Sequence, residues 1–179
     1  MRITGGDWRG RRLKPLKGFK GRPTTDFARE SLFNLFRSRI DLEGARVLDL
    51  FSGTGMVGIE CASRGAASVT AVEKQRGACA YIKESYSALG FEEVVVINLD
   101  VFSFVKKVFV KYDLVFADPP YDLKKLAELP ELVRESGLLA EDGLFCLEHD
   151  ESNSFDGVDG FLERRKYGHV HFSFFTFES

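Results

Sequence analysis

Residues 47–58 read VLDLFSGTGMVG, an apolar run that passes directly into a glycine-rich turn. Gly53, Gly55 and Gly58 fit the spacing G-x-G-x-x-G, and glycine lets the backbone approach a ligand closely. The free N–H groups at the start of the following helix favour an anionic or polar ligand group. The stretch therefore predicts a strand, a ligand-binding turn and a helix in succession.

On either side of this unit the chain alternates between short apolar runs and segments with helical spacing. The runs are apolar throughout, which is typical of parallel strands covered on both faces. Before them, Thr24, Thr25 and Asp26 are candidate N-caps for a helix at 26–39. We expect four strands, each followed by a helix, at 46–51 and 55–64, 68–73 and 75–88, 94–98 and 101–109, and 112–117 and 123–136.

The last third of the chain changes pattern. We expect a fifth strand at 144–149, and then strands at 161–166 and 169–177 joined by the tight turn Tyr167-Gly168. This turn leaves no room for a crossover helix, so the last two strands must be antiparallel. The predicted fold is α/β and Rossmann-like: a mostly parallel seven-stranded sheet with a C-terminal antiparallel hairpin, flanked by helices.

The composition is that of a folded protein. Of the 179 residues, 44% are hydrophobic and 29% are charged, which excludes disordered and collagen-like classes. The first residues are basic, and no stretch reaches roughly 18 consecutive apolar residues, so we expect neither a signal peptide nor a membrane span.

Cysteine and histidine side chains do not indicate a metal site. No C-x-x-C or Cys/His spacing occurs, which favours a reducing, cytoplasmic location for the three cysteines, Cys61, Cys79 and Cys146. His169 and His171 are expected to be neighbours on one strand face, and His149 to stand alone, all three in structural roles.

The charge is unevenly distributed along the chain. The formal net charge is -2, yet residues 1–22 contain eight cations and one acid, giving +7, while residues 23–179 carry -9. Like charges this dense repel one another and are stabilised chiefly by a polyanion. We therefore treat 1–22 as a basic arm and 23–179 as the folded domain. Taken in isolation, such a run favours the plainer interpretation, a solvated N-terminus.

Two carboxylates flank the glycine turn in the predicted sheet. Glu73 ends the second strand, where a carboxylate can accept hydrogen bonds from both hydroxyls of a ribose. The spacing alone would fit NAD. Asp49, however, would repel a pyrophosphate and would suit the ammonium of an amino acid, which points to S-adenosylmethionine. The alternative is that Asp49 merely caps the turn.

The third strand ends in a similar way. Asp100 is placed to accept from an adenine amino group, while Val101 or Phe102 lies against the ring. Asp100 fits equally well as the N-cap of the helix that follows.

Asp118-Pro119-Pro120-Tyr121 follows the fourth strand directly. Two prolines hold a stiff, extended backbone that can aim carbonyl oxygens. The exocyclic amine of a nucleobase is a weak nucleophile because its lone pair is delocalised. The Asp118 carboxylate and the Pro119 carbonyl can grip its two N–H groups and direct the lone pair, while Tyr121 stacks on the base. The alternative is an ordinary proline-rich turn.

Several blocks of the chain resemble the bacterial 16S ribosomal RNA guanine-N2 methyltransferases. The resemblance spans nearly the whole chain, although the C-terminal half of that family is variable. The blocks are GGDWRGR at 5–11, RPTTD at 22–26, RESLFN at 29–34, the turn at 49–55 and DPPY at 118–121.

This resemblance implies a class I methyltransferase fold, S-adenosylmethionine as methyl donor, and a guanine of small-subunit ribosomal RNA as acceptor. The substrate would be this RNA within a partly or fully assembled 30S subunit. The residues expected to bind the cofactor, including a segment that closes over it, are Thr24, Thr25, Asp49, Phe51, Ser52, Gly53, Thr54, Gly55, Glu73, Lys74, Asp100, Val101 and Phe102.

The resemblance also implies that the basic arm meets RNA. Its cations would hold phosphates while the tryptophan stacks or anchors. The guanine must be unpaired or extruded, since a base-paired guanine uses its amine, so we expect the acceptor in a loop. The residues expected to bind RNA are Trp8, Arg9, Arg11, Arg12, Lys14 and Arg22.

Three other functions stay open at this point. The same tetrapeptide suits an adenine amine in DNA, although the chain is small and lacks a recognition domain. A non-catalytic RNA-binding assembly factor would have a vestigial cofactor site. A nicotinamide oxidoreductase is the least favoured, because nothing in the sequence suggests a hydride acceptor site.

Overall fold

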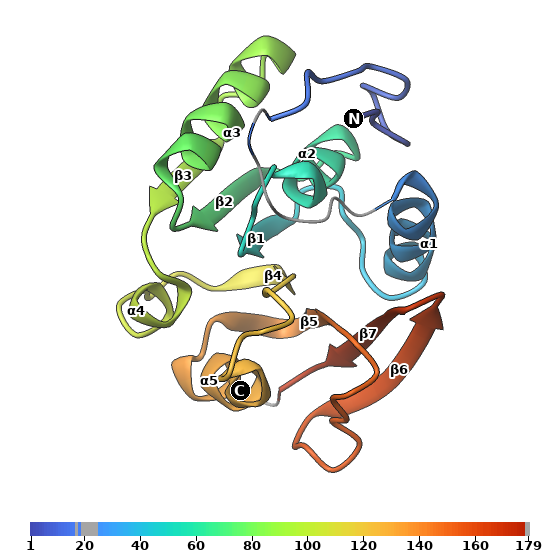
Figure 1. Ribbon diagram of the computed structural model, residues 1–179, viewed down its shortest axis with the longest axis vertical. Helices are drawn as coiled ribbons and strands as arrows, with labels where there is room; N and C mark the ends of the chain where they lie inside the picture. Colours follow the sequence, from blue (N-terminus) through green and yellow to red (C-terminus); the bar gives the residue numbers. More distant parts are fainter. Residues whose placement is uncertain (17, 19–24, 178–179) are drawn as a thin grey trace.

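The protein forms one seven-stranded sheet, seen here in a computed structural model that describes residues 1–16, 18 and 25–177. The strand order is β3-β2-β1-β4-β5-β7-β6, with β1 to β5 parallel and β6 and β7 antiparallel (Figure 1). The predicted sheet and its hairpin are therefore confirmed. The strands are β1 Arg46–Leu50, β2 Ser68–Glu73, β3 Val94–Asn98, β4 Tyr112–Ala117, β5 Leu139–His149, β6 Phe161–Tyr167 and β7 Val170–Phe175.

Helices cover both faces of the sheet and divide the core in two. Apolar side chains of α1, α2 and α3 pack on one face, over residues such as Val47, Phe116 and Cys146. Those of α4 and α5 pack on the other face, over Leu48 and Phe145. The helices are α1 Asp26–Arg37, α2 Met56–Ser63, α3 Arg76–Leu89, α4 Val101–Val105 and α5 Leu129–Ser136, with a short 3-10 helix, η1, at Leu126–Glu128.

Three elements differ from the predicted ones by three residues or more at one end, and the others by at most two. The helix predicted at 101–109 ends at Val105, and Phe109 beyond it is exposed. The helix predicted at 123–136 is divided into η1 and α5, because Pro130 lies in the first turn of α5, where proline favours a helix start. Strand β5 begins five residues early, across an irregular register that includes Asp142 at a φ of 58°.

The predicted placement of the histidines is wrong, while their structural roles stay a prediction. His149 does not stand alone: it lies opposite His171 in the β5–β7 pairing, with ring centroids 5.6 Å apart, and its Nε2 lies 2.8 Å from Ser173 Oγ. His169 lies in the turn before β7 and not on a strand face. The turn comprises Gly168 and His169, one residue later than predicted, because glycine takes the left-handed conformation there.

The first part of the basic arm packs on the domain. Ile3 is fully buried, Arg2 pairs across a bridge with Arg12, and the Trp8 ring meets Phe91 edge-on at 5.9 Å. A hydrogen bond to a carboxylate anchors this segment: buried Glu60 on α2 accepts from Thr4 N at 2.7 Å. The same carboxylate also accepts hydrogen bonds from Arg29 and Arg64.

Neither a membrane-spanning helix nor a metal-binding cluster is found among the described residues. In this part of the chain, no helix has the length and apolar character needed to cross a bilayer. Within the same residues, no group of three or more His, Cys, Asp or Glu side chains is arranged to bind a metal ion.

Candidate active site

Four acidic side chains lie at the carboxyl edge of the parallel strands. In the register of the sheet, Leu50 of β1 lies beside Val72 of β2 and Ala117 of β4. The carboxylates next to these positions therefore gather at one edge. Side chains two residues apart on a strand project to the same face, and the residue two positions before each acid packs against α1 to α3. All four acids therefore project to that face: Asp49, Glu73, Asp118 and Glu148.

The turn after β1 has the tight backbone that its glycines predicted. Gly53 and Gly55 have φ values of 54° and 71°, and Gly55 N donates to Ser52 O at 2.6 Å. Phe51 also has a positive φ, 57°, which costs a residue with a side chain about 1–2 kcal/mol. Such strain is typical of backbone held for a ligand.

Gly58 has a packing role in addition to its place in the motif. A Cβ at this position would come within 2.7 Å of Tyr86 Oη and 3.3 Å of Asp49 Oδ2. The glycine therefore lets helix α2 approach the sheet closely.

Asp49 is buried and has little to compensate its charge. Its Oδ2 accepts from Gly58 N at 3.3 Å. The pKa of Asp49 is raised to about 7: burial raises it most, the charges of Asp118 and Glu73 add to the rise, and the hydrogen bond from Gly58 N–H lowers it. A carboxylate in this setting is stabilised by a cationic ligand group, as predicted for an ammonium.

The buried charge of Asp49 makes the stability of the ligand-free protein depend on pH. Its folded pKa lies above the ordinary 3.8, so the folded state binds more protons and stability falls as pH rises from about 4 to 7. Asp49→Asn is expected to raise the free energy of unfolding by about 4 kcal/mol at pH 8 and by much less at pH 4. Urea unfolding at both pH values measures this, and an equal change at the two would contradict it.

Glu73 links the ends of β1 and β2. Its Oε2 accepts from Gly53 N at 2.9 Å and its Oε1 from Gln75 N at 2.8 Å. The carboxylate is thus held beside the glycine turn. Lys74 follows it, and its carbonyl accepts from Asn98 Nδ2 at 2.8 Å.

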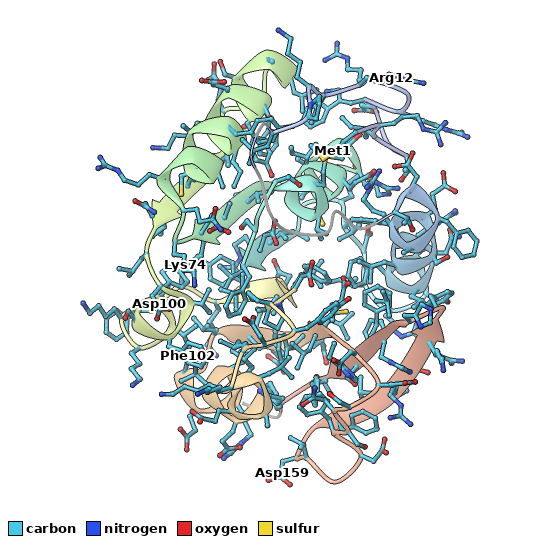
Figure 2. All side chains as sticks on the ribbon, in the orientation of Figure 1. Met1, Arg12, Lys74, Asp100, Phe102 and Asp159 are labelled. Carbon is cyan, nitrogen blue, oxygen red and sulfur yellow. The ribbon has the colours of Figure 1, made fainter. Side chains whose placement is uncertain are left out.

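Lys74, Asp100 and Phe102 lie in one region, beside α4 and the ends of β2 and β3 (Figure 2). The Asp100 side chain accepts from Ser103 N at 3.1 Å and is the N-cap of α4, one of its two predicted roles. Val101 is buried, while the partly exposed Phe102 ring lies 5.7 Å from Lys125 Nζ. An apolar surface thus adjoins the acid.

The tetrapeptide at 118–121 leaves the sheet at the end of β4. Asp118 N donates to Leu50 O at 3.4 Å, which ties the corner to β1, and Leu123 N donates to Pro120 O at 2.9 Å. Burial raises the pKa of Asp118 to about 7. Pro119 is buried and the Tyr121 side chain is 48% exposed, so an aromatic face borders the acid on the solvent side.

The comparisons with known proteins agree with this geometry. Residues 1–176 match the family described as Conserved hypothetical protein 95. The chain is 36% identical over 159 residues to ribosomal RNA small subunit methyltransferase D of Escherichia coli strain K12, covering 88% of this chain and 79% of the relative. The chain belongs to the ribosomal RNA small subunit methyltransferase D family.

Solved structures support the same assignment. The structure of yhhF from Escherichia coli superposes with a TM-score of 0.86 at 30% identity, covering 98% of this chain and 96% of that one. A hypothetical protein from Thermus thermophilus has a TM-score of 0.83 at 33% identity, covering 98% of both chains. The methyltransferase thus has the class I fold that the sequence predicted.

The predicted RNA-binding residues of this methyltransferase differ in their exposure to solvent. Trp8 is an anchor packed on Phe91, while Arg9, Arg11, Arg12 and Lys14 are exposed. Figure 2 shows Arg12 on the N-terminal loop at the surface. Among the described residues, these four cations form no ion pair with a carboxylate.

The segment predicted to close over the cofactor is 22–25, and its residues 22–24, which include Arg22 and Thr24, lie outside the described residues. Thr25 is described, and its Oγ1 accepts from Ala28 N at 3.2 Å as the N-cap of α1. The cap confirms one of its two predicted roles, and its contact with the cofactor stays a prediction.

Sequence reasoning missed two buried acids in the methyltransferase. Glu60 binds the N-terminal segment through Thr4, which lies 56 positions away, and it also binds Arg29 of α1, which lies 31 positions away. Glu148 lies within the strand predicted at 144–149, where no role was given to it. Its place near a strand end, like that of Asp118, was the pattern that could have identified it.

Proposed function

We propose that this methyltransferase transfers a methyl group from S-adenosylmethionine to the exocyclic N2 amine of a guanine in small-subunit ribosomal RNA. The observation that carries the proposal is the position of Asp118. Its carboxylate lies at the same sheet edge and on the same face as Asp49 and Glu73, and its charge raises the pKa of Asp49. An acceptor site and a donor site would therefore adjoin.

The residues present fit S-adenosylmethionine. A buried Asp49 suits the cofactor's ammonium, and Glu73, held beside the glycine turn, suits its ribose hydroxyls. Asp100 would accept from the adenine amino group through Oδ2, with Val101 or Phe102 against the ring. When bound, the cofactor supplies a methyl group on a positively charged sulfur.

The chain's own residues would prepare the guanine nitrogen. Asp118 and the Pro119 carbonyl would each accept an N–H of the amine, and the Tyr121 ring would stack on the base. As the nitrogen bonds the methyl carbon and the carbon–sulfur bond breaks, positive charge moves to nitrogen. Asp118 would stabilise this charge, and its pKa of about 7 suits it to take the released proton.

The exposed cations of the N-terminal segment support an RNA acceptor. Arg9, Arg11, Arg12 and Lys14 would bind phosphates, each adding about 0.7 to 0.9 to the slope of log affinity against log salt. Arg22 would join them. The relative named above is a ribosomal RNA small subunit methyltransferase, which favours this RNA over DNA. We propose that the RNA is methylated within a partly or fully assembled 30S subunit.

A direct assay tests the proposed acceptor. The enzyme is incubated with labelled S-adenosylmethionine and small ribosomal subunits from cells that lack a methyltransferase of this family, and nucleosides are analysed by mass spectrometry. We expect N2-methylguanosine from the subunits and no methylation of duplex DNA. Methylation of an adenine amine, or of no nucleoside in any of these substrates, would contradict the proposal.

A further inference from the structure

Glu148 lies next to Asp118 on the neighbouring strand. In the parallel β4–β5 register, Ala117 lies beside Leu147. The residues that follow them, Asp118 and Glu148, are therefore neighbours as well. Adjacent strands are about 4.8 Å apart. Phe116 and Cys146, two residues earlier, both pack in the core under α1 to α3, so the two acids project to the same face.

The Glu148 carboxylate is buried and incompletely hydrogen-bonded. The residue is 4% exposed, and its Oε2 has no hydrogen-bond partner among the described residues. Phe172 lies opposite on β7 and offers no polar group. Burial raises the pKa of Glu148 well above its usual range, and the charge of Asp118 raises it further.

Glu60 shows how a buried carboxylate elsewhere in the described part of the chain is satisfied by hydrogen-bond donors. Glu60 is equally buried, but its oxygens accept from Thr4, Arg29 and Arg64. A buried acid without such partners destabilises the fold at the pH where it ionises. A group of this kind, aimed at the site edge, points to a ligand that supplies the missing donors.

Guanine carries donors that match two adjacent carboxylates. Its N1–H and its N2 amine lie side by side on the Watson–Crick edge. Adenine presents an N6 amine beside N1, which is an acceptor and would face a carboxylate lone pair unfavourably. Hydrogen bonds from guanine would favour the ionised form of both acids.

We propose that Glu148 is a specificity residue of the methyl-acceptor site, whose carboxylate accepts the N1–H of the guanine that Asp118 holds by its N2 amine. The inference rests on the proposed function and deepens it. Asp118 would hold the reacting nitrogen, and Glu148 would distinguish guanine from bases that lack a hydrogen on N1.

The test uses 2-aminopurine, which keeps the 2-amino group of guanine but has an unprotonated N1. The RNA that the enzyme methylates is prepared with guanine or 2-aminopurine at the methylated position, and kcat/KM is measured for both. Wild-type enzyme is expected to favour guanine by about tenfold or more, the effect of one buried hydrogen bond lost. Glu148→Gln can donate to N1 of 2-aminopurine, so its preference is expected to fall by at least about tenfold.

Matched variants separate this role from a structural one. Glu151→Gln makes the same change on an exposed side chain that pairs with Lys166, and it is expected to keep the wild-type preference. Glu148→Ala removes the acceptor without adding a donor, and its preference is expected to fall part of the way. If Glu148→Gln does not fold, the preference of Glu148→Ala for guanine over 2-aminopurine tests the role of Glu148.

The outcomes distinguish the two proposals. If the wild-type enzyme forms N2-methylguanosine but accepts 2-aminopurine equally well, or if the Glu148 variants keep the wild-type preference, the role of Glu148 is overturned and the proposed function stands. If the wild-type enzyme forms no N2-methylguanosine on small subunits, the proposed function itself fails.

Discussion

Asp118→Ala is expected to lower the rate of methyl transfer by about 10²- to 10⁴-fold while leaving the affinity for S-adenosylmethionine within about twofold. The variant loses the carboxylate that would orient the amine and stabilise the charge that develops on nitrogen. Asp118 approaches β1 through its backbone N–H, which donates to Leu50 O and is retained in the variant. The cofactor site should therefore stay intact.

Initial rates with small ribosomal subunits, and calorimetric titration with S-adenosylmethionine, measure the two quantities separately. Asp113→Ala is a matched control, because Asp113 lies at the opposite end of the same strand, where it pairs with Arg46. Asp118→Asn keeps one carbonyl acceptor and should lose less activity than the alanine variant. Wild-type turnover in Asp118→Ala would show that the assigned chemistry is wrong.

Glu73→Ala is expected to give the opposite pattern, with the Kd for S-adenosylmethionine raised by about 10²-fold. The variant loses the acceptor proposed for the ribose hydroxyls, and it also loses the hydrogen bonds that Glu73 accepts from Gly53 N at 2.9 Å and Gln75 N at 2.8 Å. Two charge-assisted hydrogen bonds to the ligand account for a change of this size. At saturating cofactor the rate should recover most of the way.

Calorimetric titration again gives the Kd, and rates over a range of cofactor concentrations show whether KM rises more than kcat falls. Glu92→Ala, on an exposed residue before β3, is the control and should bind as the wild type does. A Glu73→Ala variant that binds the cofactor normally would remove Glu73 from the donor site.

The sequence allowed the sheet and three of the four site acids to be predicted, for one physical reason. Asp49, Glu73 and Asp118 each lie at the end of a short apolar run, and parallel strands end at one edge. Glu148 was not predicted as a site residue, although it too lies near the end of a predicted strand, at 144–149. Its proximity to Asp118 depends on the register of β4 and β5, which shifts near Tyr112 and Leu114.

Contacts between distant segments account for the other differences. The pairing of His149 with His171 depends on where β7 returns along β5, which the local pattern of the hairpin does not specify. The docking of the basic segment depends on Glu60, an acid within an otherwise apolar helix. In both cases the partner that decides the structure lies more than 20 residues away.

The order in which the chain adds strands to the sheet reverses between β1 and β4: strands β1, β2 and β3 extend the sheet to one side, and β4 and β5 extend it to the other. On the proposed assignment, this point separates the two binding functions: residues 49–102 bind the methyl donor, and residues 118–148 bind the acceptor base. Each half of the sheet can then vary with little disturbance to its counterpart. An engineer who wishes to redirect this enzyme to another nucleobase should therefore mutate the second half and leave the first untouched.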